Sequence, residues 1–174
     1  MKKDRTPRLV MAAVFAALTC VATMVINIPI PATKGYLNLG DCMVLLGAFF
    51  LGPYYGAASG ALGSALSDLL LGYAYYAPGT AVIKGLMALM AALLFALLKH
   101  RSKLAYLLAA FVSEFWMVLG YFLYESTVLG YGLAAVESVP ANLIQAIGGA
   151  LIGVMLYRVL ITMPQLKQFQ SKEG

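Results

Sequence analysis

The sequence consists mostly of long apolar runs, separated by short stretches that hold glycine, proline or charged residues. A run of about 20 apolar residues is long enough to cross the hydrocarbon core of a bilayer as a helix. Only helices and closed barrels satisfy every backbone hydrogen bond in hydrocarbon, and these runs lack the alternation of barrel strands. Because 62% of the 174 residues are hydrophobic and 11% are charged, a soluble domain is excluded. We predict an all-α membrane protein with a single domain, 1–174, and six helices at about 9–26, 41–51, 54–71, 80–98, 104–124 and 138–162.

Basic residues cluster at three places along the chain, 2–8, 99–103 and 158–172. Positive clusters that flank membrane spans mark the cytoplasmic side. Four predicted helices separate the first two clusters and two separate the last two, so we expect both termini in the cytoplasm, at the plasma membrane of a prokaryote. These clusters account for the net charge of +5, which therefore does not indicate nucleic-acid binding. The run at 9–26 is too long for a signal peptide and lacks an A-x-A cleavage site, so we expect it to be retained.

The residues that most often carry chemistry give no pattern of a catalytic or metal site. Cys20 and Cys42 lie in apolar segments without metal-ligand spacing, and His100, the one histidine, lies in a basic cluster. The sequence contains no Walker A loop, H-E-x-x-H, C-x-x-C or G-x-S-x-G motif. We therefore expect no enzyme activity, no metal and no cofactor bound by this chain.

Ionisable and amide side chains interrupt the predicted helices. A charge costs about 2.5 to 3.5 kcal/mol at the centre of a membrane helix, so each implies a partner or a function. Asp41 opens a predicted helix, where its charge also suits the helix dipole, and Asp68 is within reach of Lys84 if their helices are adjacent; we interpret both carboxylates as structural. The topology directs the polar groups toward an outward-facing pocket roofed by 27–40 and 73–79. The predicted substrate-binding residues are Lys84, Glu114, Tyr121, Asn142 and Gln145.

Small residues form a strip on the first predicted helix, where Ala12, Ala13, Ala16 and Ala17 make two interleaved pairs spaced by four. Such a strip lets another helix approach closely. It serves either to dock a second subunit or to pack against a helix of the same bundle.

The chain resembles the substrate-binding S components of energy-coupling factor (ECF) vitamin transporters over nearly its whole length. The resemblance rests on its size, its topology, the alanine strip and the runs GYLNLGD (35–41), LGPYYGAASGALGSALSDLL (51–70) and YAPGTAVIKG (76–85). It implies a six-helix bundle with cytoplasmic termini that captures a vitamin from outside. It also implies that the alanine strip docks a transmembrane coupling subunit (EcfT type), and that two ATPase subunits on other chains use ATP.

Within that family the sequence looks most like the branch linked to hydroxymethylpyrimidine and pyridoxine. Both are small, neutral, hydroxymethylated heteroaromatic compounds, which tyrosine rings and amide groups suit by stacking and hydrogen bonding. The alternatives are an S component for another vitamin, such as riboflavin or thiamine, or a membrane scaffold without transport function. Polar groups in register within the membrane argue against a scaffold because they would be an unexplained cost.

Overall fold

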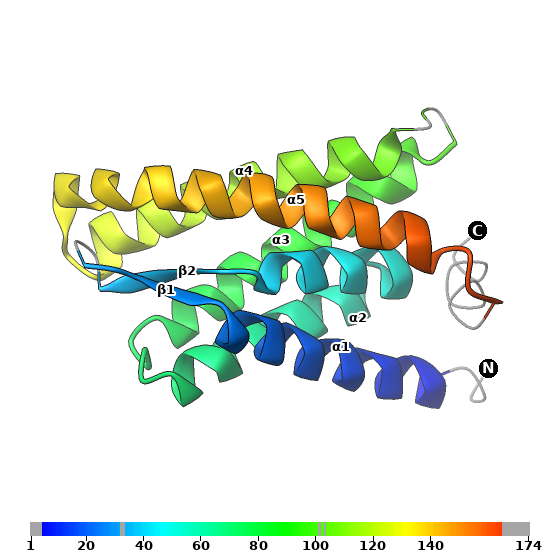
Figure 1. Ribbon diagram of the computed structural model, residues 1–174, viewed down its shortest axis with the longest axis horizontal. Helices are drawn as coiled ribbons and strands as arrows, with labels where there is room; N and C mark the ends of the chain where they lie inside the picture. Colours follow the sequence, from blue (N-terminus) through cyan, green and yellow to red (C-terminus); the bar gives the residue numbers. More distant parts are fainter. Residues whose placement is uncertain (1–4, 32–33, 101, 103, 165–174) are drawn as a thin grey trace.

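The computed structural model describes residues 5–31, 34–100, 102 and 104–164. Within these residues the chain is mostly helical, and neighbouring helices pack along the long axis of the molecule (Figure 1). Two short strands and two short helical turns connect the long helices. The elements are α1 (Arg5–Val25), β1 (Asn27–Ile30), β2 (Gly35–Asn38), α2 (Gly40–Leu70), α3 (Ala77–Leu98), α4 (Ala105–Leu123), the π-helical turn η1 (Tyr124–Val128), the 3₁₀ helix η2 (Gly132–Ser138) and α5 (Val139–Leu160).

The helix α2 reverses direction at Gly52, where the sequence predicts a break between two helices. Gly52 has φ 78° and ψ −174°, a conformation that favours glycine, and Pro53 follows it. A Cβ built on Gly56 would lie 2.7 Å from Ala48 Cα. Eight residues of a straight helix span about 12 Å. The segments 40–51 and 53–70 therefore fold back on each other.

In the part of the chain that the structure describes, five helical segments are long and apolar enough to cross a membrane, against six predicted. The difference lies in α2, which counts as one segment although Gly52 divides it. Its first part, 40–51, would be about 18 Å long, shorter than a hydrocarbon core of about 30 Å. The other helices match their predicted limits closely, except that α1 begins at Arg5 because Pro7 is tolerated in a first turn.

A β hairpin replaces the loop that we predicted at 27–40. Strands β1 and β2 are antiparallel and pair Asn27 with Asn38 and Ile30 with Gly35. In this two-stranded sheet both strands are edges, so Pro29, which lacks an N–H group, is tolerated. The hairpin contacts α5 through β2 and so covers one end of the bundle (Figure 1).

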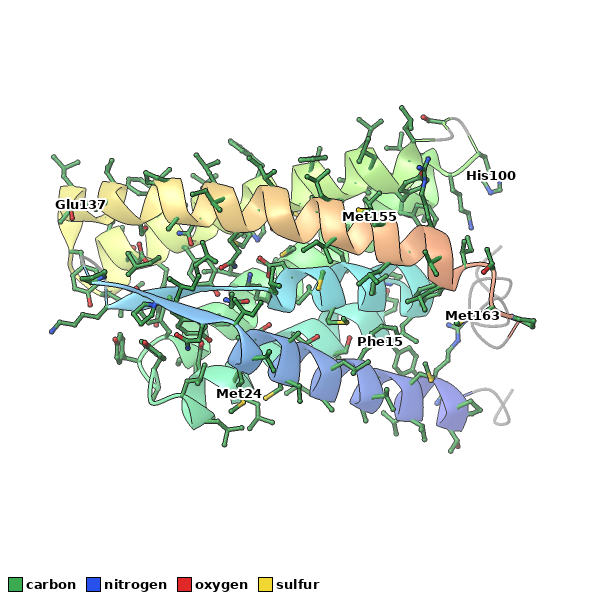
Figure 2. The ribbon with its side chains drawn as sticks, in the orientation of Figure 1. Phe15, Met24, His100, Glu137, Met155 and Met163 are labelled. Carbon is green, nitrogen blue, oxygen red and sulfur yellow. The ribbon has the colours of Figure 1, made fainter. Side chains whose placement is uncertain are left out.

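The two ends of the molecule hold different parts of the chain. The start of α1, the α3–α4 connection and the end of α5 lie at one end, and the hairpin, η1 and η2 lie at the other (Figure 1). Figure 2 shows the same separation for single residues, with His100 and Met163 opposite Glu137. The described basic residues of the predicted cytoplasmic clusters thus share one end, which we call the terminal end.

The first part of α2 forms the centre of the bundle. Val44, Leu45 and Phe50 are at most 1% exposed. Small residues bring the neighbouring helices close, since a Cβ on Gly63 would lie 2.4 Å from the backbone oxygen of Ala16 in α1. This packing fixes α1 and α3 around α2 and places the side chains of the site described next.

Candidate functional site

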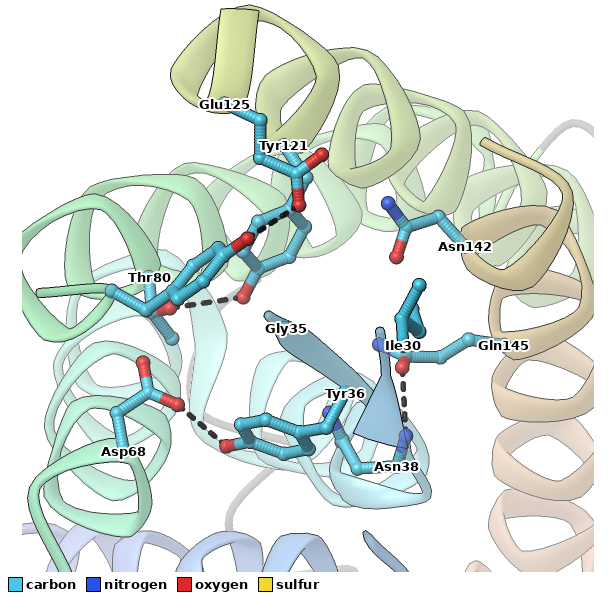
Figure 3. A pocket seen from close by; sticks show the side chains of 11 residues that line it. Ile30, Gly35, Tyr36, Asn38, Asp68, Thr80, Tyr121, Glu125, Asn142 and Gln145 are labelled. Atoms are coloured by element: carbon cyan, nitrogen blue, oxygen red, sulfur yellow. Dashed lines mark hydrogen bonds between the residues drawn. The ribbon is translucent and has the colours of Figure 1, made fainter. Parts of the chain in front are cut away.

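A cavity with about 350 Å³ of empty space lies beneath the β hairpin (Figure 3). Its wall combines residues from the hairpin, α2, α3, α4, α5 and the short turns between them. Most of the lining side chains are polar or aromatic. They are Ile30, Gly35, Tyr36, Asn38, Asp68, Tyr76, Thr80, Tyr121, Glu125, Asn142 and Gln145.

One wall of the cavity joins the hairpin to the end of α2. Tyr36 Oη donates a hydrogen bond to Asp68 Oδ1 (2.5 Å), and its ring lies 4.6 Å from that of Tyr73. Burial and the adjacent Asp68 carboxylate raise the pKa of the Tyr36 hydroxyl, so it stays a donor. The buried Asp68 Oδ2 accepts no hydrogen bond from the described residues, although Thr80 lies near the same carboxylate. An acceptor therefore remains for a ligand.

The opposite wall is fixed by Glu125 in η1. Its carboxylate, 3% exposed, accepts hydrogen bonds from Tyr76 Oη (2.8 Å) and from the Ser138 hydroxyl. Tyr121, one turn earlier, donates to Thr80 Oγ1 at 3.1 Å. These bonds hold two tyrosine rings at the cavity in fixed positions (Figure 3).

A buried ion pair lies under the cavity. Lys84, 2% exposed, pairs with Asp41, which has no exposed surface, and its Nζ lies 5.4 Å from the Tyr121 ring centroid. Gln145 Nε2 donates to Asp41 Oδ2 (2.7 Å), while Gln145 Oε1 accepts from the backbone N–H of Asn38 (2.8 Å). The two partners define the orientation of the Gln145 amide. The amide thus connects the ion pair to the hairpin.

Glu114 adds a second carboxylate beside this pair. Its side chain is 1% exposed, and neither oxygen has a hydrogen-bond partner among the described residues. A Cβ on Gly149 would lie 2.7 Å from Glu114 Oε1 and 2.8 Å from Asp41 Cβ, so the approach of the two acidic side chains depends on a glycine in α5. Two buried carboxylates therefore lie close together, and Lys84 pairs with that of Asp41.

The predicted substrate-binding residues separate into two layers. Tyr121, Asn142 and Gln145 line the cavity, whereas Lys84 and Glu114 belong to the charged group beneath it. Of the two carboxylates interpreted as structural, Asp41 is the partner of Lys84, and Asp68 lines the cavity and bonds Tyr36 instead.

Several lining residues were not among the predicted substrate-binding residues. Tyr36 and Asn38 belong to the run GYLNLGD, and Glu125 follows Tyr121 by four residues, which is one helical turn. Tyr76 lies in the segment predicted to roof the pocket. Nothing in the sequence distinguished Thr80, because a threonine near the start of a helix most often forms a hydrogen bond with the backbone.

The alanine strip of α1 does not form one surface. Ala12 is 6% exposed and Ala16 packs against Gly63, so this pair contributes to the bundle. Ala13 and Ala17 are exposed. Ala12 and Ala16 therefore pack within the bundle, whereas Ala13 and Ala17 leave a surface of α1 open, and docking of a second subunit on the strip stays a prediction.

Comparisons with known proteins agree with this architecture. The chain is 29% identical over 161 residues to the thiamine precursor transporter HmpT of Lactococcus lactis subsp. cremoris, covering 92% of this chain and 89% of that protein. It is 38% identical over 133 residues to a Pyrococcus woesei protein described as an uncharacterized protein in a gap 3′ region, covering 76% of this chain and 87% of that protein.

A solved structure bears on the fold of the chain, and a family model bears on its family. The fold matches the S component of a bacterial ECF transporter with a TM-score of 0.68, at 21% identity, over 91% of this chain and 98% of that chain. Residues 3–162 match the model of the ECF-type riboflavin transporter S component. The chain therefore belongs to the S component family of ECF-type transporters, and it is a multi-pass membrane protein.

Proposed function

We propose that this S component captures a small, neutral heteroaromatic vitamin precursor in the cavity beneath the hairpin. Hydroxymethylpyrimidine is the favoured ligand and pyridoxine is second. The observation that carries the proposal is the cavity itself, which is small, buried under a hairpin and lined by polar groups held in place by the protein.

The size of the cavity favours a ligand with a single ring. The empty space between its lining side chains totals about 350 Å³, part of it open to solvent, so the cavity leaves little room for a ligand. Riboflavin, with three fused rings and a ribityl chain, needs more room than one pyrimidine or pyridine ring. The similarity to a thiamine precursor transporter supports the same choice, while the name of the matching family model keeps riboflavin as the alternative.

The chemistry of the wall suits the same ligand. Tyr76 and Tyr121 offer aromatic faces for stacking, and the side chain of Asn142 is directed into the cavity (Figure 3). The amino group of hydroxymethylpyrimidine can donate a hydrogen bond to Asp68 Oδ2. Its hydroxyl group and ring nitrogen can form hydrogen bonds with the amide of Asn142.

A calorimetric titration of the purified protein with hydroxymethylpyrimidine, pyridoxine, riboflavin and thiamine tests the ligand. Native mass spectrometry of protein purified without added ligand gives the mass of any molecule that it retains. Tightest binding of hydroxymethylpyrimidine or pyridoxine supports the proposal, and tightest binding of riboflavin favours the alternative. Absence of binding to all four would favour a scaffold role.

Uptake also needs partners, because S components work with a transmembrane coupling subunit and ATPase subunits. We propose that this chain docks the EcfT-type subunit through the exposed pair Ala13 and Ala17, from the face of α1 that the bundle leaves open. The termini would then lie in the cytoplasm and the cavity would open outward.

Co-purification with the coupling subunit and the two ATPases tests this surface. A bulky side chain holds helices apart, so Ala17→Leu should abolish the complex while ligand binding persists. The matched control is Leu18→Ala, an exposed position outside the pair. An undiminished complex from Ala17→Leu would remove α1 from the interface.

A further inference from the structure

A second pocket, whose wall combines basic side chains with aromatic and apolar ones, lies at the terminal end of the bundle, far from the hairpin. It has about 560 Å³ of empty space and is open to the outside. The end of α3, the beginning of α4 and the end of α5 surround it. Its lining residues are Phe95, Lys99, Ser102, Ala105, Tyr106, Tyr157, Arg158 and Ile161.

The arginine of this pocket is held in place by a tyrosine. Arg158 Nε donates a hydrogen bond to Tyr106 Oη at 2.6 Å, and its Cζ lies 5.4 Å from the centroid of the same ring. The guanidinium group keeps its other N–H groups for a second acceptor, and the Tyr106 hydroxyl keeps its own proton to donate. Lys99 supplies another cation from the end of α3. Together these groups are donors for which the described residues offer no anion.

The residues that the structure describes supply no counter-charge there. Among the described residues five are acidic, and none of them lines this pocket. Asp41 and Glu114 lie at the level of Gly149, nine residues or about 14 Å along α5 from Arg158. Asp68 and Glu125 line the cavity at the hairpin end, and Glu137 lies at that end too (Figure 2). An anion for Lys99 and Arg158 must come from outside this part of the chain.

We propose that this pocket binds the phosphate headgroup of an anionic phospholipid. Arginine matches phosphate with paired N–H groups, and basic pockets between membrane helices at the surface bind lipid headgroups. The phosphate would contact Lys99, Arg158 and the Tyr106 hydroxyl.

The surroundings favour a lipid over free phosphate. Phe95 and Tyr157 form an apolar wall, with ring centroids 5.7 Å apart. Exposed apolar residues lie close to the lining residues in the sequence: Leu97, Leu104 and Val159 are 70%, 50% and 61% exposed. In a bilayer these side chains contact acyl chains, so a phospholipid satisfies both the cations and these apolar side chains. Inorganic phosphate would satisfy only the cations.

The test is native mass spectrometry of the full chain with phosphatidylglycerol and phosphatidylcholine that carry identical acyl chains. The wild-type protein should retain phosphatidylglycerol preferentially. Lys99 and Arg158 would each contact the phosphate and should each contribute about fivefold in affinity, so Lys99→Gln/Arg158→Gln should bind phosphatidylglycerol about 30-fold more weakly. Lys99→Gln alone should show about a fivefold loss, which keeps the test available if the double variant folds poorly.

A control with the same loss of charge is Arg5→Gln/Lys34→Gln, since both residues are exposed and lie outside the pocket. It should bind phosphatidylglycerol as the wild type does. Equal retention of the two lipids, or equal losses in both double variants, would overturn the site. Displacement of the lipid by inorganic phosphate at similar concentration would assign the site to free anions instead. Loss of a co-purified protein, with lipid binding unchanged, would assign the surface to a protein partner.

Discussion

The hairpin end and the terminal end of this bundle satisfy their polar groups in opposite ways. At the hairpin end several charged groups are buried in the interior and held by specific partners, as in the Asp41–Lys84 pair, whose two side chains are at most 2% exposed. At the terminal end the interior is a cluster of aromatic rings around Tyr157, with centroids 5.2 to 5.7 Å from those of Phe49, Phe50, Phe95 and Tyr106. The cationic side chains there are half-buried or exposed.

This difference means that the hairpin end is suited to ligand recognition, whereas the interior of the terminal end mainly packs the helices together. A buried polar network requires that each group meet one particular partner, so it defines a specific shape for a ligand. An aromatic cluster tolerates rearrangement better because its contacts lack that directional requirement. Loss of a single partner should therefore be costly at the hairpin end and nearly neutral for the cations of the terminal end.

Replacement of Lys84 by methionine should show the largest contrast. It leaves the Asp41 carboxylate buried without its cation, which typically costs about 3 to 5 kcal/mol of stability. The same replacement at Lys99, at the other end, should change the stability by less than about 0.5 kcal/mol. Thermal unfolding of both variants in the same detergent measures the difference.

If the Lys84→Met protein does not fold, the double variant Asp41→Asn/Lys84→Met tests the same point. It removes both charges, so it should recover part of the lost stability. Equal stabilities of the Lys84→Met and Lys99→Met proteins would show that the buried ion pair contributes no more to stability than the lysine at the terminal end.

Much of the fold follows from the sequence because the bilayer limits the choices. The long apolar runs predicted the five long helices α1 to α5 with ends close to the observed ones. Gly52 and Pro53 predicted the reversal in α2. The hairpin was missed, because Pro29 and Pro31 are typical of loops and four-residue strands carry little periodic signal. The side of the membrane at which each end lies remains a prediction.

The site was harder to predict than the fold. Helical spacing places Asn142 and Gln145 on one face, and both line the cavity. Spacing within a helix does not tell which residue of another helix lies opposite, so it could not distinguish Asp41 from Asp68 as the partner of Lys84. Nor could it show that the missing side chain of Gly149 lets α5 approach Asp41. Contributions from the hairpin, such as Tyr36, depend on strand register and could not be derived from helix patterns.

Within the hairpin end, Asn142 should affect the ligand more than the fold. Its amide is 5% exposed and lines the cavity, and the hydrogen bond that Asn142 Nδ2 donates to Ser138 Oγ is long, at 3.5 Å. Removing one hydrogen-bonding partner in a desolvated site costs about 1 to 3 kcal/mol, so Asn142→Ala should weaken ligand binding about 5- to 150-fold. Calorimetric titration measures the loss.

The matched control for Asn142→Ala is Ile144→Ala, on the same helix but 65% exposed. It should leave the affinity unchanged. Wild-type affinity of the Asn142→Ala protein, for whichever ligand the wild type binds, would remove α5 from the binding site.

The smallest effect is expected at Glu114, although its carboxyl group lies beside that of Asp41. Asp41 is bonded to Lys84 and Gln145, so Asp41→Asn removes the charge that the lysine needs and should cost about 3 to 5 kcal/mol. Glu114 has no such partner among the described residues, and glutamine keeps its shape and adds N–H groups next to an acceptor. Glu114→Gln should therefore change the stability by less than about 1 kcal/mol. Thermal unfolding of the two variants side by side decides the point: similar losses would mean that Lys84 depends on both carboxylates equally, and that the four groups act as one unit.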